Sequence, residues 1–269
     1  MALIQANFFA ESLGMATEAV VILPQATTGQ IGLQNQVRVK DGDTPCPVLY
    51  LLHGLSDDHT AWLRRTAIER YVAPMGLAVV MPNVHRSFYA DMTHGGKYFT
   101  FVTEELPRLM RSFFRLSERR EDTFVAGLSM GGYGAFRCAL THPDRYAAAA
   151  SLSGALDRTT QRSTRSASID ASLALAFGDM DRYAGSDHDL LRLASEIVSR
   201  GDDRPALYQC CGTADFLYDQ NRSFHAHCET IGLEVTHAWH AGQDHRWHYW
   251  DRQLRDVLGW LPLEAEPAD

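Results

Sequence analysis

A serine between two glycines constrains the fold more than any other feature of the chain. Gly-Leu-Ser-Met-Gly at positions 127–131 follows the short apolar run Thr123–Ala126 and opens the small-residue segment Met130–Leu140. The run is typical of a buried strand, and the segment has helical composition. A strand and a helix joined by so tight a turn must approach closely, which requires small residues around the serine. The pattern predicts that Ser129 lies on a strained turn at the end of a strand. The alternative is a glycine-rich helix start without chemistry.

Apolar runs and helical segments alternate along much of the rest of the chain. This alternation predicts an α/β fold with a mostly parallel central sheet and helices on both faces. Two β-leaning segments at the start, Ile4–Phe9 and Glu18–Leu23, are expected to form an antiparallel edge. Helices are expected at Thr60–Tyr71 and at Phe99–Phe114, where Pro107 predicts a kink. The other expected strands are Pro47–Gly54, Leu77–Met81, Ala147–Leu152, 206–212 and 234–239.

The length of 269 residues fits one domain, residues 1–269. The alternation fails after the strand at Ala147–Leu152, where 158–170 is rich in Ser, Thr and Arg with little periodicity. We therefore expect a small, irregular, cap-like insertion at about 155–200.

Charge and cysteine usage exclude several classes of function. Thirty-three acidic residues against 25 basic ones give a net charge of −8, and no basic run suggests a nucleic-acid or membrane partner. The longest uncharged stretch, Ala19–Val37, contains Pro24 and several polar residues and is not expected to cross a bilayer. Five cysteines without metal-ligand spacing indicate reduced thiols in a cytoplasmic protein and no metal site.

A serine nucleophile needs a base, and the base needs a carboxylate that orients it. With this strand–turn–helix motif the carboxylate and then the histidine follow the serine, each on a loop after a strand. Asp215 follows the strand at 206–212, and His245 follows the strand at 234–239. Asp215 could instead cap the next helix, with Asp219 as the fallback. The weaker candidates in the irregular region are Asp179 and Asp181.

His245 alone among the candidate bases has the expected loop position. The other histidines considered belong to predicted helices or to strands and their ends: His225, His227, His237, His240 and His248. His53 ends the strand at Pro47–Gly54 and is expected to brace the following loop.

Two backbone N–H groups are expected to stabilise the oxyanion. One belongs to Met130, directly after the nucleophile. The other belongs to Leu55, where Gly54 allows a sharp bend. Trp62, Phe88 and Tyr89 are candidates for the substrate pocket, and aromatic packing under loops is the alternative. Three arginines of the irregular region are candidates for contact with an anionic substrate, with a solvated basic loop as the alternative: Arg158, Arg162 and Arg165.

Several segments together resemble the tributyrin esterase family, a branch of the esterase D and S-formylglutathione hydrolase group of α/β-hydrolases. They include VLYLLHGLSDDHTAW, VVMPN, RREDTFVAGLSMGGYGAFRCAL, CGTADFLYDQN and GQDHRWHYW. The likeness covers most of the chain and is weakest over Arg158–Arg204. It implies the α/β-hydrolase fold, Ser129, Asp215 and His245 as catalytic residues, no cofactor, and homo-oligomers in many members.

The resemblance and the motifs predict a serine carboxylesterase that hydrolyses short-chain esters, acetyl to butyryl, through an acyl-enzyme. Acetylated and cinnamoylated carbohydrate esters are among the family's substrates. The family's alternative is an S-formylglutathione hydrolase: the FGG-type N-terminal segment of those enzymes is missing, but the Gln-Asp-His before and at His245 is closer to their form. An acyltransferase and a non-catalytic binding protein on the same scaffold are further alternatives.

Overall fold

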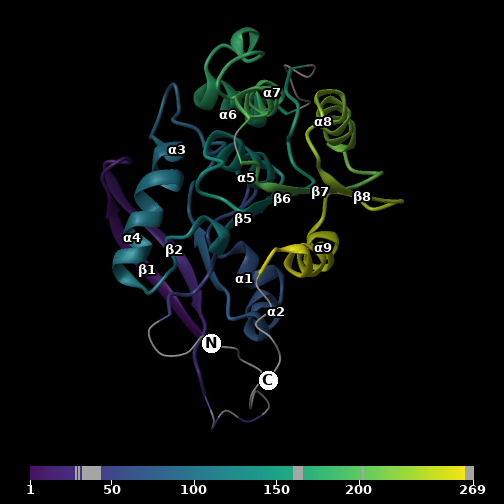
Figure 1. The fold of residues 1–269 in the computed structure, drawn as a ribbon. Helices are drawn as coiled ribbons and strands as arrows, with labels where there is room; N and C mark the ends of the chain where they lie inside the picture. Colours follow the sequence, from purple (N-terminus) through teal and green to yellow (C-terminus); the bar gives the residue numbers. More distant parts are fainter. Residues whose placement is uncertain (28, 30, 32–43, 160–165, 202, 264–269) are drawn as a thin grey trace.

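An eight-stranded sheet runs through the molecule (Figure 1), in the order β1-β2-β4-β3-β5-β6-β7-β8. The computed structural model describes residues 1–27, 29, 31, 44–159, 166–201 and 203–263. The strands are β1 (Ala2–Ala10), β2 (Met15–Leu23), β3 (Val48–Leu52), β4 (Ala78–Pro82), β5 (Thr123–Leu128), β6 (Ala148–Leu152), β7 (Ala206–Gly212) and β8 (Thr236–His240).

The sheet is parallel from β4 through β8, and β1 and β2 form an antiparallel edge against β4. Strands β3, β4, β5 and β6 are buried along their whole length. Their continuous apolar runs therefore suit a sheet covered on both faces. The predicted α/β class, the mostly parallel sheet and the antiparallel edge are confirmed.

Helices cover both faces of the sheet. One face carries α1 (Ala61–Arg65), α2 (Ile68–Val72) and α9 (Trp247–Trp260). The other carries α4 (Leu106–Phe113), α5 (Met130–Thr141), α7 (Leu190–Arg200) and α8 (Tyr218–Ile231). Shorter elements are α3 (Tyr98–Thr100), η1 (Ala73–Met75), η3 (Arg120–Asp122) and η4 (Met180–Arg182). No helix in the described ranges is long and apolar enough to cross a membrane.

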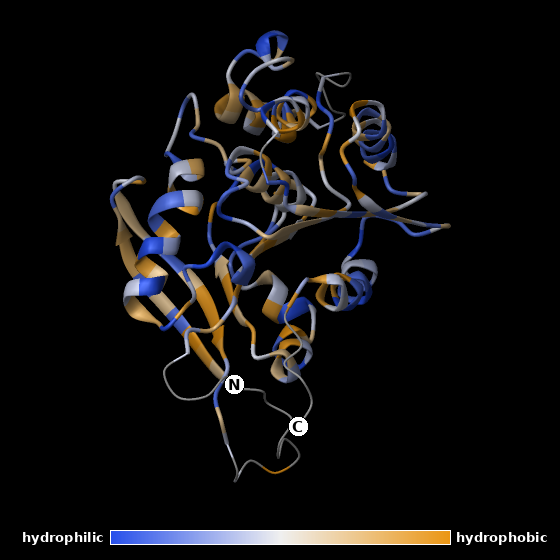
Figure 2. Cartoon of the chain, viewed as in Figure 1, coloured by the Kyte–Doolittle hydropathy of each residue, from blue (hydrophilic) through white to orange (hydrophobic). Residues whose placement is uncertain are grey.

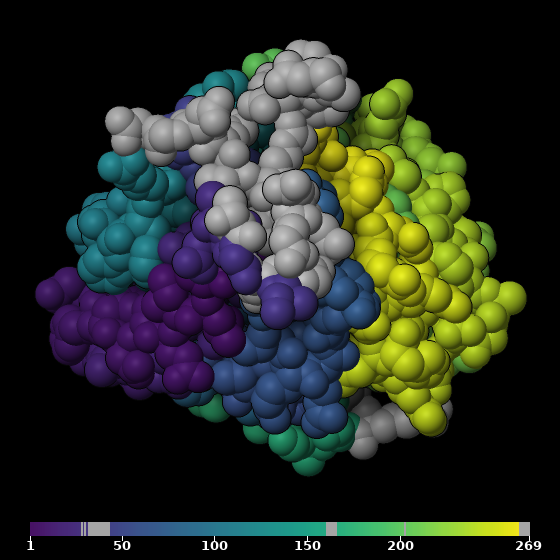
Figure 3. Space-filling model, turned by 90° about the horizontal axis from the view of Figure 1, so that it is seen from below, coloured from purple at the N-terminus to yellow at the C-terminus, as the bar shows by residue number. Residues whose placement is uncertain are grey.

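The hydrophobic core lies in two layers, one on each side of the sheet. In Figure 2 the central strands are mostly hydrophobic, whereas α4 and α9 carry hydrophilic residues as well. Figure 3 shows the blue segment of α1 and α2 beside the yellow C-terminal helix. There the Tyr71 hydroxyl donates a hydrogen bond to Asp251 at 2.9 Å, which joins α2 to α9.

Two predicted helices are interrupted. The helix expected over Thr60–Tyr71 is split at Thr66, whose hydroxyl donates to the Trp62 carbonyl and accepts from the Ile68 N–H, so it closes α1 and opens α2. The helix expected over Phe99–Phe114 contains a π-helical turn, η2 (Phe101–Glu105), directly before α4. Pro107 lies in the first turn of α4, where its missing N–H costs little.

The connection from β6 to β7 carries α6 (Ala167–Phe177), η4 and α7 in its described part. Leu190 and Ile197 of α7 are fully buried in the core. Arg162 and Arg165 lie outside the described residues.

Candidate active site

Ser129 occupies the strained turn between β5 and α5. Its φ of 53° and ψ of −115° are unusual for a residue with a side chain. A Cβ on Gly127 would lie 2.4 Å from the Gly131 carbonyl oxygen, and one on Gly131 would lie 2.4 Å from the Leu52 carbonyl oxygen. Both glycines are therefore required by close approach of backbone to backbone. The turn has the geometry that the sequence motif predicts.

The backbone of Ser129 is held by its neighbours in the sheet. The Ser129 N–H donates to the Leu152 carbonyl at 2.9 Å, and the Ala155 N–H donates to the Ser129 carbonyl at 3.2 Å. These bonds connect the turn to the end of β6. They keep a conformation that would otherwise relax.

Asp215 and His245 form a hydrogen-bonded pair at the ends of β7 and β8. His245 Nδ1 lies 2.8 Å from Oδ2 and 3.0 Å from Oδ1 of Asp215. The Asp215 side chain is fully buried, and Oδ1 also accepts the Leu217 N–H at 2.8 Å. Asp215 therefore shapes the start of the next helix and also binds the imidazole. With Nδ1–H donating to the carboxylate, Nε2 is the ring nitrogen left to accept a proton.

Two aromatic rings hold the His245 imidazole in place. The Phe216 ring centroid lies 4.4 Å from that of His245, and the Trp250 ring meets it edge-on at 4.8 Å. The Trp250 indole N–H donates to the hydroxyl of Ser153 at 3.1 Å, which fixes the indole in turn. The orientation of the histidine is thus set by packing as well as by Asp215.

Leu55 and Met130 line the same cavity as Ser129. Met130 is the first residue of α5, so its N–H has no acceptor one turn earlier in the helix. The Leu55 N–H donates to no group in the described part of the chain. A Cβ on Gly54 would lie 3.8 Å from Ser129 Cβ, which brings the loop after β3 against the nucleophile turn. Both N–H groups are therefore available for a ligand.

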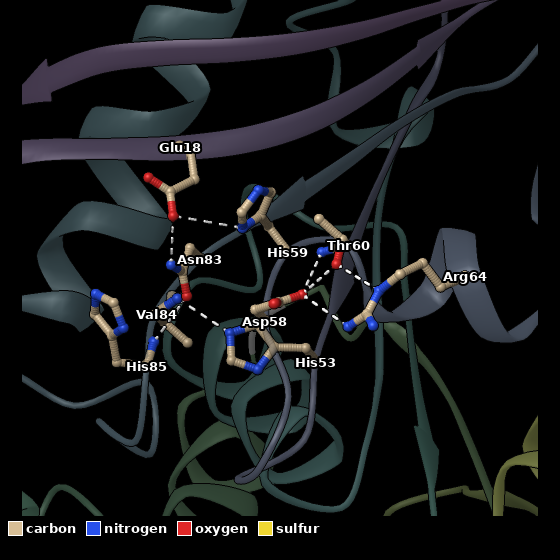
Figure 4. A network of polar contacts seen from close by, with 9 residues as sticks. All are labelled: Glu18, His53, Asp58, His59, Thr60, Arg64, Asn83, Val84 and His85. Carbon is tan, nitrogen blue, oxygen red and sulfur yellow. Dashed lines mark hydrogen bonds and ion pairs between the residues drawn. The ribbon is translucent and has the colours of Figure 1, made fainter.

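His53 braces the loop after β3, as expected. Its Nδ1–H donates to the Gly54 carbonyl at 2.8 Å, and Nε2 accepts the Val84 N–H at 3.1 Å from the loop after β4. Burial lowers the pKa of His53 to about 4, so the ring is neutral near pH 7. Figure 4 shows this ring between the two loops, with Asn83 donating to Glu18 at 2.9 Å nearby.

The cavity lined by Ser129, His245, Leu55 and Met130 has a volume of about 490 Å³. Ser129 and His245 line it from different loops at the carboxyl ends of the parallel strands. Ligands of open parallel sheets bind at this edge. In the described residues no group of three or more His, Cys, Asp or Glu side chains could hold a metal ion. The geometry fits a serine nucleophile with a histidine base.

Comparison with known proteins identifies the family. Residues 24–261 match the model of the Esterase family. The chain belongs to this family. An acetyl esterase from Caldicellulosiruptor saccharolyticus is 31% identical over 97% of this chain and 98% of its own. The resemblance to esterases in the sequence is confirmed at this level.

Solved structures agree with the family. FphF, a fluorophosphonate-binding serine hydrolase of Staphylococcus aureus, has a TM-score of 0.86 and 32% identity over 98% of this chain and 99% of its own. The S-formylglutathione hydrolase FrmB of the same organism has a TM-score of 0.82 and 34% identity, with 97% and 98% covered. These likenesses confirm the fold class. This esterase is a serine hydrolase of the carboxylic ester type.

Of the three aromatic residues predicted for the substrate pocket of this esterase, Phe88 lines the cavity. Trp62 does not, because its buried indole N–H donates to the Leu52 carbonyl at 3.0 Å, behind Trp247. Tyr89 does not either, because it is fully buried and its hydroxyl donates to the His53 carbonyl at 2.9 Å. For these two, the alternative of packing under loops is the one observed.

The remaining candidates lie in other roles. Asp219 lies in the first turn of α8, and Asp179 caps η4 by accepting the Asp181 N–H at 2.9 Å. The rings of His225 in α8 and His237 in β8 lie at a tilt to each other, with centroids 4.0 Å apart. Arg158 lines the cavity.

Several residues that line the cavity were not predicted from the sequence. Phe216, Trp247 and Trp250 are one, two and five positions beyond Asp215 or His245, so nearness in sequence to those residues could have indicated them. Arg86 and Ile169 come from the loop after β4 and from α6. No pattern in the sequence connects these two residues to the site.

Proposed function

We propose that this esterase hydrolyses short-chain acyl esters through an acyl-enzyme, with Ser129, His245 and Asp215 as its catalytic residues. The observation that carries the proposal is the hydrogen bond of 2.8 Å between buried Asp215 and His245, because His245 lines one cavity with a serine on a strained turn. A nucleophile, a base and an orienting carboxylate are the parts that acyl transfer through serine requires.

In the proposed first half-reaction, Ser129 Oγ attacks the ester carbonyl while His245 Nε2 takes the hydroxyl proton. The carbonyl oxygen becomes an oxyanion and accepts hydrogen bonds from the Leu55 and Met130 N–H groups. The tetrahedral intermediate collapses, the bond to the alcohol oxygen breaks, and His245 gives its proton to the leaving alcohol. Asp215 stabilises the imidazolium through Nδ1–H.

In the second half-reaction, water attacks the acyl group on Ser129. His245 takes a proton from the water, and the same two N–H groups hold the second oxyanion. Collapse of this intermediate breaks the bond to Ser129 Oγ, which regains its proton from the histidine. The carboxylic acid is released and the enzyme is restored.

The acetyl esterase relative supports the acetyl group as a substrate, and the range from acetyl to butyryl follows the resemblance to the tributyrin esterase family. The cavity also supports ester substrates, because Phe88, Trp247 and Trp250 provide apolar surface beside Ser129 and His245. Acetylated carbohydrates are a natural class of such esters.

Hydrolysis of a glutathione thioester is the second candidate function. The 34% identity to FrmB over nearly the whole of both chains favours it. Acyl transfer to an alcohol is the third, favoured by 28% identity over 86% of this chain to a diacylglycerol acyltransferase/mycolyltransferase, Ag85B of Mycobacterium leprae. Both use the same nucleophile and base, so only substrates and products distinguish them.

A series of p-nitrophenyl esters from acetate to laurate tests the proposal, with S-formylglutathione beside it and Ser129→Ala as the control. We expect the highest kcat/KM between acetate and butyrate, and loss of activity in the variant. A dominant rate on S-formylglutathione would favour the thioesterase. Ester products with an added alcohol would favour the transferase. Unchanged activity of Ser129→Ala would overturn the assigned site.

A further inference from the structure

Arg158 is a buried cation in the wall of the catalytic cavity. Its exposed fraction is 6%, and it lines the same cavity as Ser129 and His245. Its Nε has no hydrogen-bond partner, and the described part of the chain offers no hydrogen bond to the rest of the guanidinium. Burial lowers its pKa, which reflects the cost of keeping this charge away from water.

Two other arginines do form hydrogen bonds through their guanidinium groups, although the Nε of Arg137, like that of Arg158, has no hydrogen-bond partner. Arg137, 5% exposed, donates to the Tyr89 carbonyl at 2.9 Å and lies 4.1 Å over the ring of Phe99. Arg86 donates to the hydroxyls of Ser172 and Ser168 at 2.8 Å and 3.0 Å. A buried charge without such partners destabilises the folded chain. The buried charge of Arg158 therefore points to a hydrogen-bond partner that is supplied by the substrate.

Nearby groups ease the burial of Arg158 without binding its donors. Tyr183, Asp170 and Asp157 each act electrostatically to raise its pKa, and among the described residues neither carboxylate forms an ion pair with it. Asp157 accepts the Thr159 N–H at 2.8 Å and the Ser223 hydroxyl at 2.5 Å. These neighbours stabilise the positive charge of Arg158, but its N–H groups have no hydrogen-bond acceptor within the described residues.

The first turn of α6 faces the same cavity. Ser166, Ser168 and Ile169 line it, and Ser166 is the residue that precedes this eleven-residue helix. The first N–H groups of a helix lack intrahelical acceptors and favour anions. Arg86 fixes this turn over the cavity through its bonds to Ser168 and Ser172. One wall therefore combines a helix start, hydroxyl groups and two guanidinium groups.

Asp57 is the carboxyl that lines the cavity on the side of Leu55. Burial raises its pKa, as does the charge of Asp58, while a hydrogen bond from the Gly54 backbone lowers it. The cavity thus has an acidic group beside the proposed oxyanion donors and basic groups beside α6. A substrate with one charged end has a single favourable orientation in such a field.

We propose that the ester substrate carries a carboxylate, which Arg158 binds together with the first turn of α6, the turn that Arg86 holds in place. The inference rests on the proposed function, because it names the class of ester that Ser129 attacks. Arg158 acts on specificity: it binds the charged end and positions the ester carbonyl at the nucleophile. A guanidinium suits this role because its donors match the two carboxylate oxygens.

Two pairs of substrates test which end of the ester carries the charge. In one pair the leaving group differs: 4-acetoxybenzoate against 4-isopropylphenyl acetate. In the other the acyl group differs: monoethyl succinate against ethyl 4-methylpentanoate. Each pair replaces a carboxylate by an isopropyl group of similar shape. The quantity measured is the ratio of kcat/KM for the anionic ester to that for the neutral one.

Arg158→Gln is expected to lower this ratio on the order of 10- to 100-fold for one pair, the range for a hydrogen bond to a charged group. The intrinsic reactivities of the esters cancel when this ratio is compared between wild type and variant, because both enzymes hydrolyse the same two esters. Arg182→Gln is the matched control, since it removes the same charge from an 88% exposed side chain of η4 outside the cavity. Its ratios are expected to equal those of the wild type.

A stability measurement separates binding from a structural role. We expect Arg158→Gln to keep or raise the Tm, because the guanidinium makes no hydrogen bond that the fold would lose. A lower Tm together with unchanged ratios would overturn the proposal. Unchanged ratios in both pairs would overturn it whatever the Tm.

Calorimetric binding to Ser129→Ala keeps the inference distinct from the proposed function. We expect 4-acetoxybenzoate or monoethyl succinate to bind this variant, and its neutral partner to bind more weakly. Adding Arg158→Gln is expected to abolish the difference. If no ester is hydrolysed by the wild type, the proposed function fails, and this experiment still decides the inference. Equal binding of charged and neutral esters would refute it.

Discussion

The two walls of the catalytic cavity are built on different principles. At the ends of the sheet strands, His245 of the wall and the residues behind it, Asp215 and His53, are each hydrogen-bonded within the protein. On the wall that contains the start of α6 and the segment after β6, the guanidinium of Arg158 is buried without a hydrogen-bond partner in the described residues. Polar groups with hydrogen-bond partners hold a fixed geometry, whereas a buried polar group without them gains free energy of binding from a ligand that supplies them. On the proposed assignment, this difference separates the groups that react from the groups that select the substrate.

Removal of the nucleophile should have the largest effect. We expect Ser129→Ala to lower kcat by about 10⁵- to 10⁶-fold, because nucleophile and base act as a unit. Binding of ester to the α6 wall is expected to persist. Steady-state kinetics on p-nitrophenyl butyrate measures the loss, and circular dichroism checks the fold. A residual rate within tenfold of the wild type would contradict the division between the walls.

Asp215→Asn should come next, with a loss of about 10⁴-fold in kcat. The amide cannot stabilise the imidazolium and favours the wrong tautomer of His245. Asp219→Asn, one helical turn away in α8, is the matched control and should retain activity. If instead the second variant lost activity and the first kept it, Asp219 would be the carboxylate of the site.

Acid should destabilise the sheet wall through His53. Its folded pKa is about 4, against about 6.5 in the unfolded chain, so the unfolded state takes up the proton first as the pH falls. The corresponding stability is present above about pH 6.5 and is lost as the pH falls through 4, by about 3 kcal/mol. His188, with its pKa also lowered to about 4 by burial, adds a loss of the same sign.

Urea unfolding at pH 7.5, 6.0 and 5.0 measures this dependence. His53→Asn should be less stable at pH 7.5 and show a flatter decline on acidification. His94→Asn, at an exposed position, should decline as the wild type does. Parallel declines of the wild type and His53→Asn would show that His53 is not the group responsible.

Trp62→Phe should have the smallest effect, about 1–2 kcal/mol of stability, from loss of the bond to the Leu52 carbonyl. Because Trp62 lies behind the cavity wall, the order of preference among acyl chain lengths should stay the same. The ester series and thermal unfolding together test this. A changed order of preference would place Trp62 in contact with the substrate after all.

The sequence predicted the sheet wall because local constraints act on neighbouring residues there. Glycines are needed around Ser129 because a Cβ there would lie 2.4 Å from a backbone carbonyl oxygen, and buried parallel strands need apolar runs. Asp215 and His245 follow strands whose ends must meet at one edge. These rules need no knowledge of side-chain packing.

The α6 wall follows no such rule. Arg86 and Ile169 are 83 positions apart in the sequence. They line the same cavity because the Arg86 side chain donates a hydrogen bond to Ser172 of α6. The split of the helix at Thr66 depends on one hydroxyl, and the π turn precedes a proline by two residues. The prediction that Trp62 and Tyr89 line the cavity was wrong because the sequence does not reveal which way an aromatic side chain points.

The backbone bonds that hold Ser129 to β6 have a consequence for how this enzyme could change over generations. The Ser129 backbone is bonded to Leu152 on one side and to Ala155 on the other, and α6 takes no part in these bonds. On the proposed assignment, substitutions in α6 and around Arg158 change the wall that a substrate meets and leave the serine turn in place. A lineage with this architecture would then acquire new substrates without passing through an intermediate that has lost its reaction.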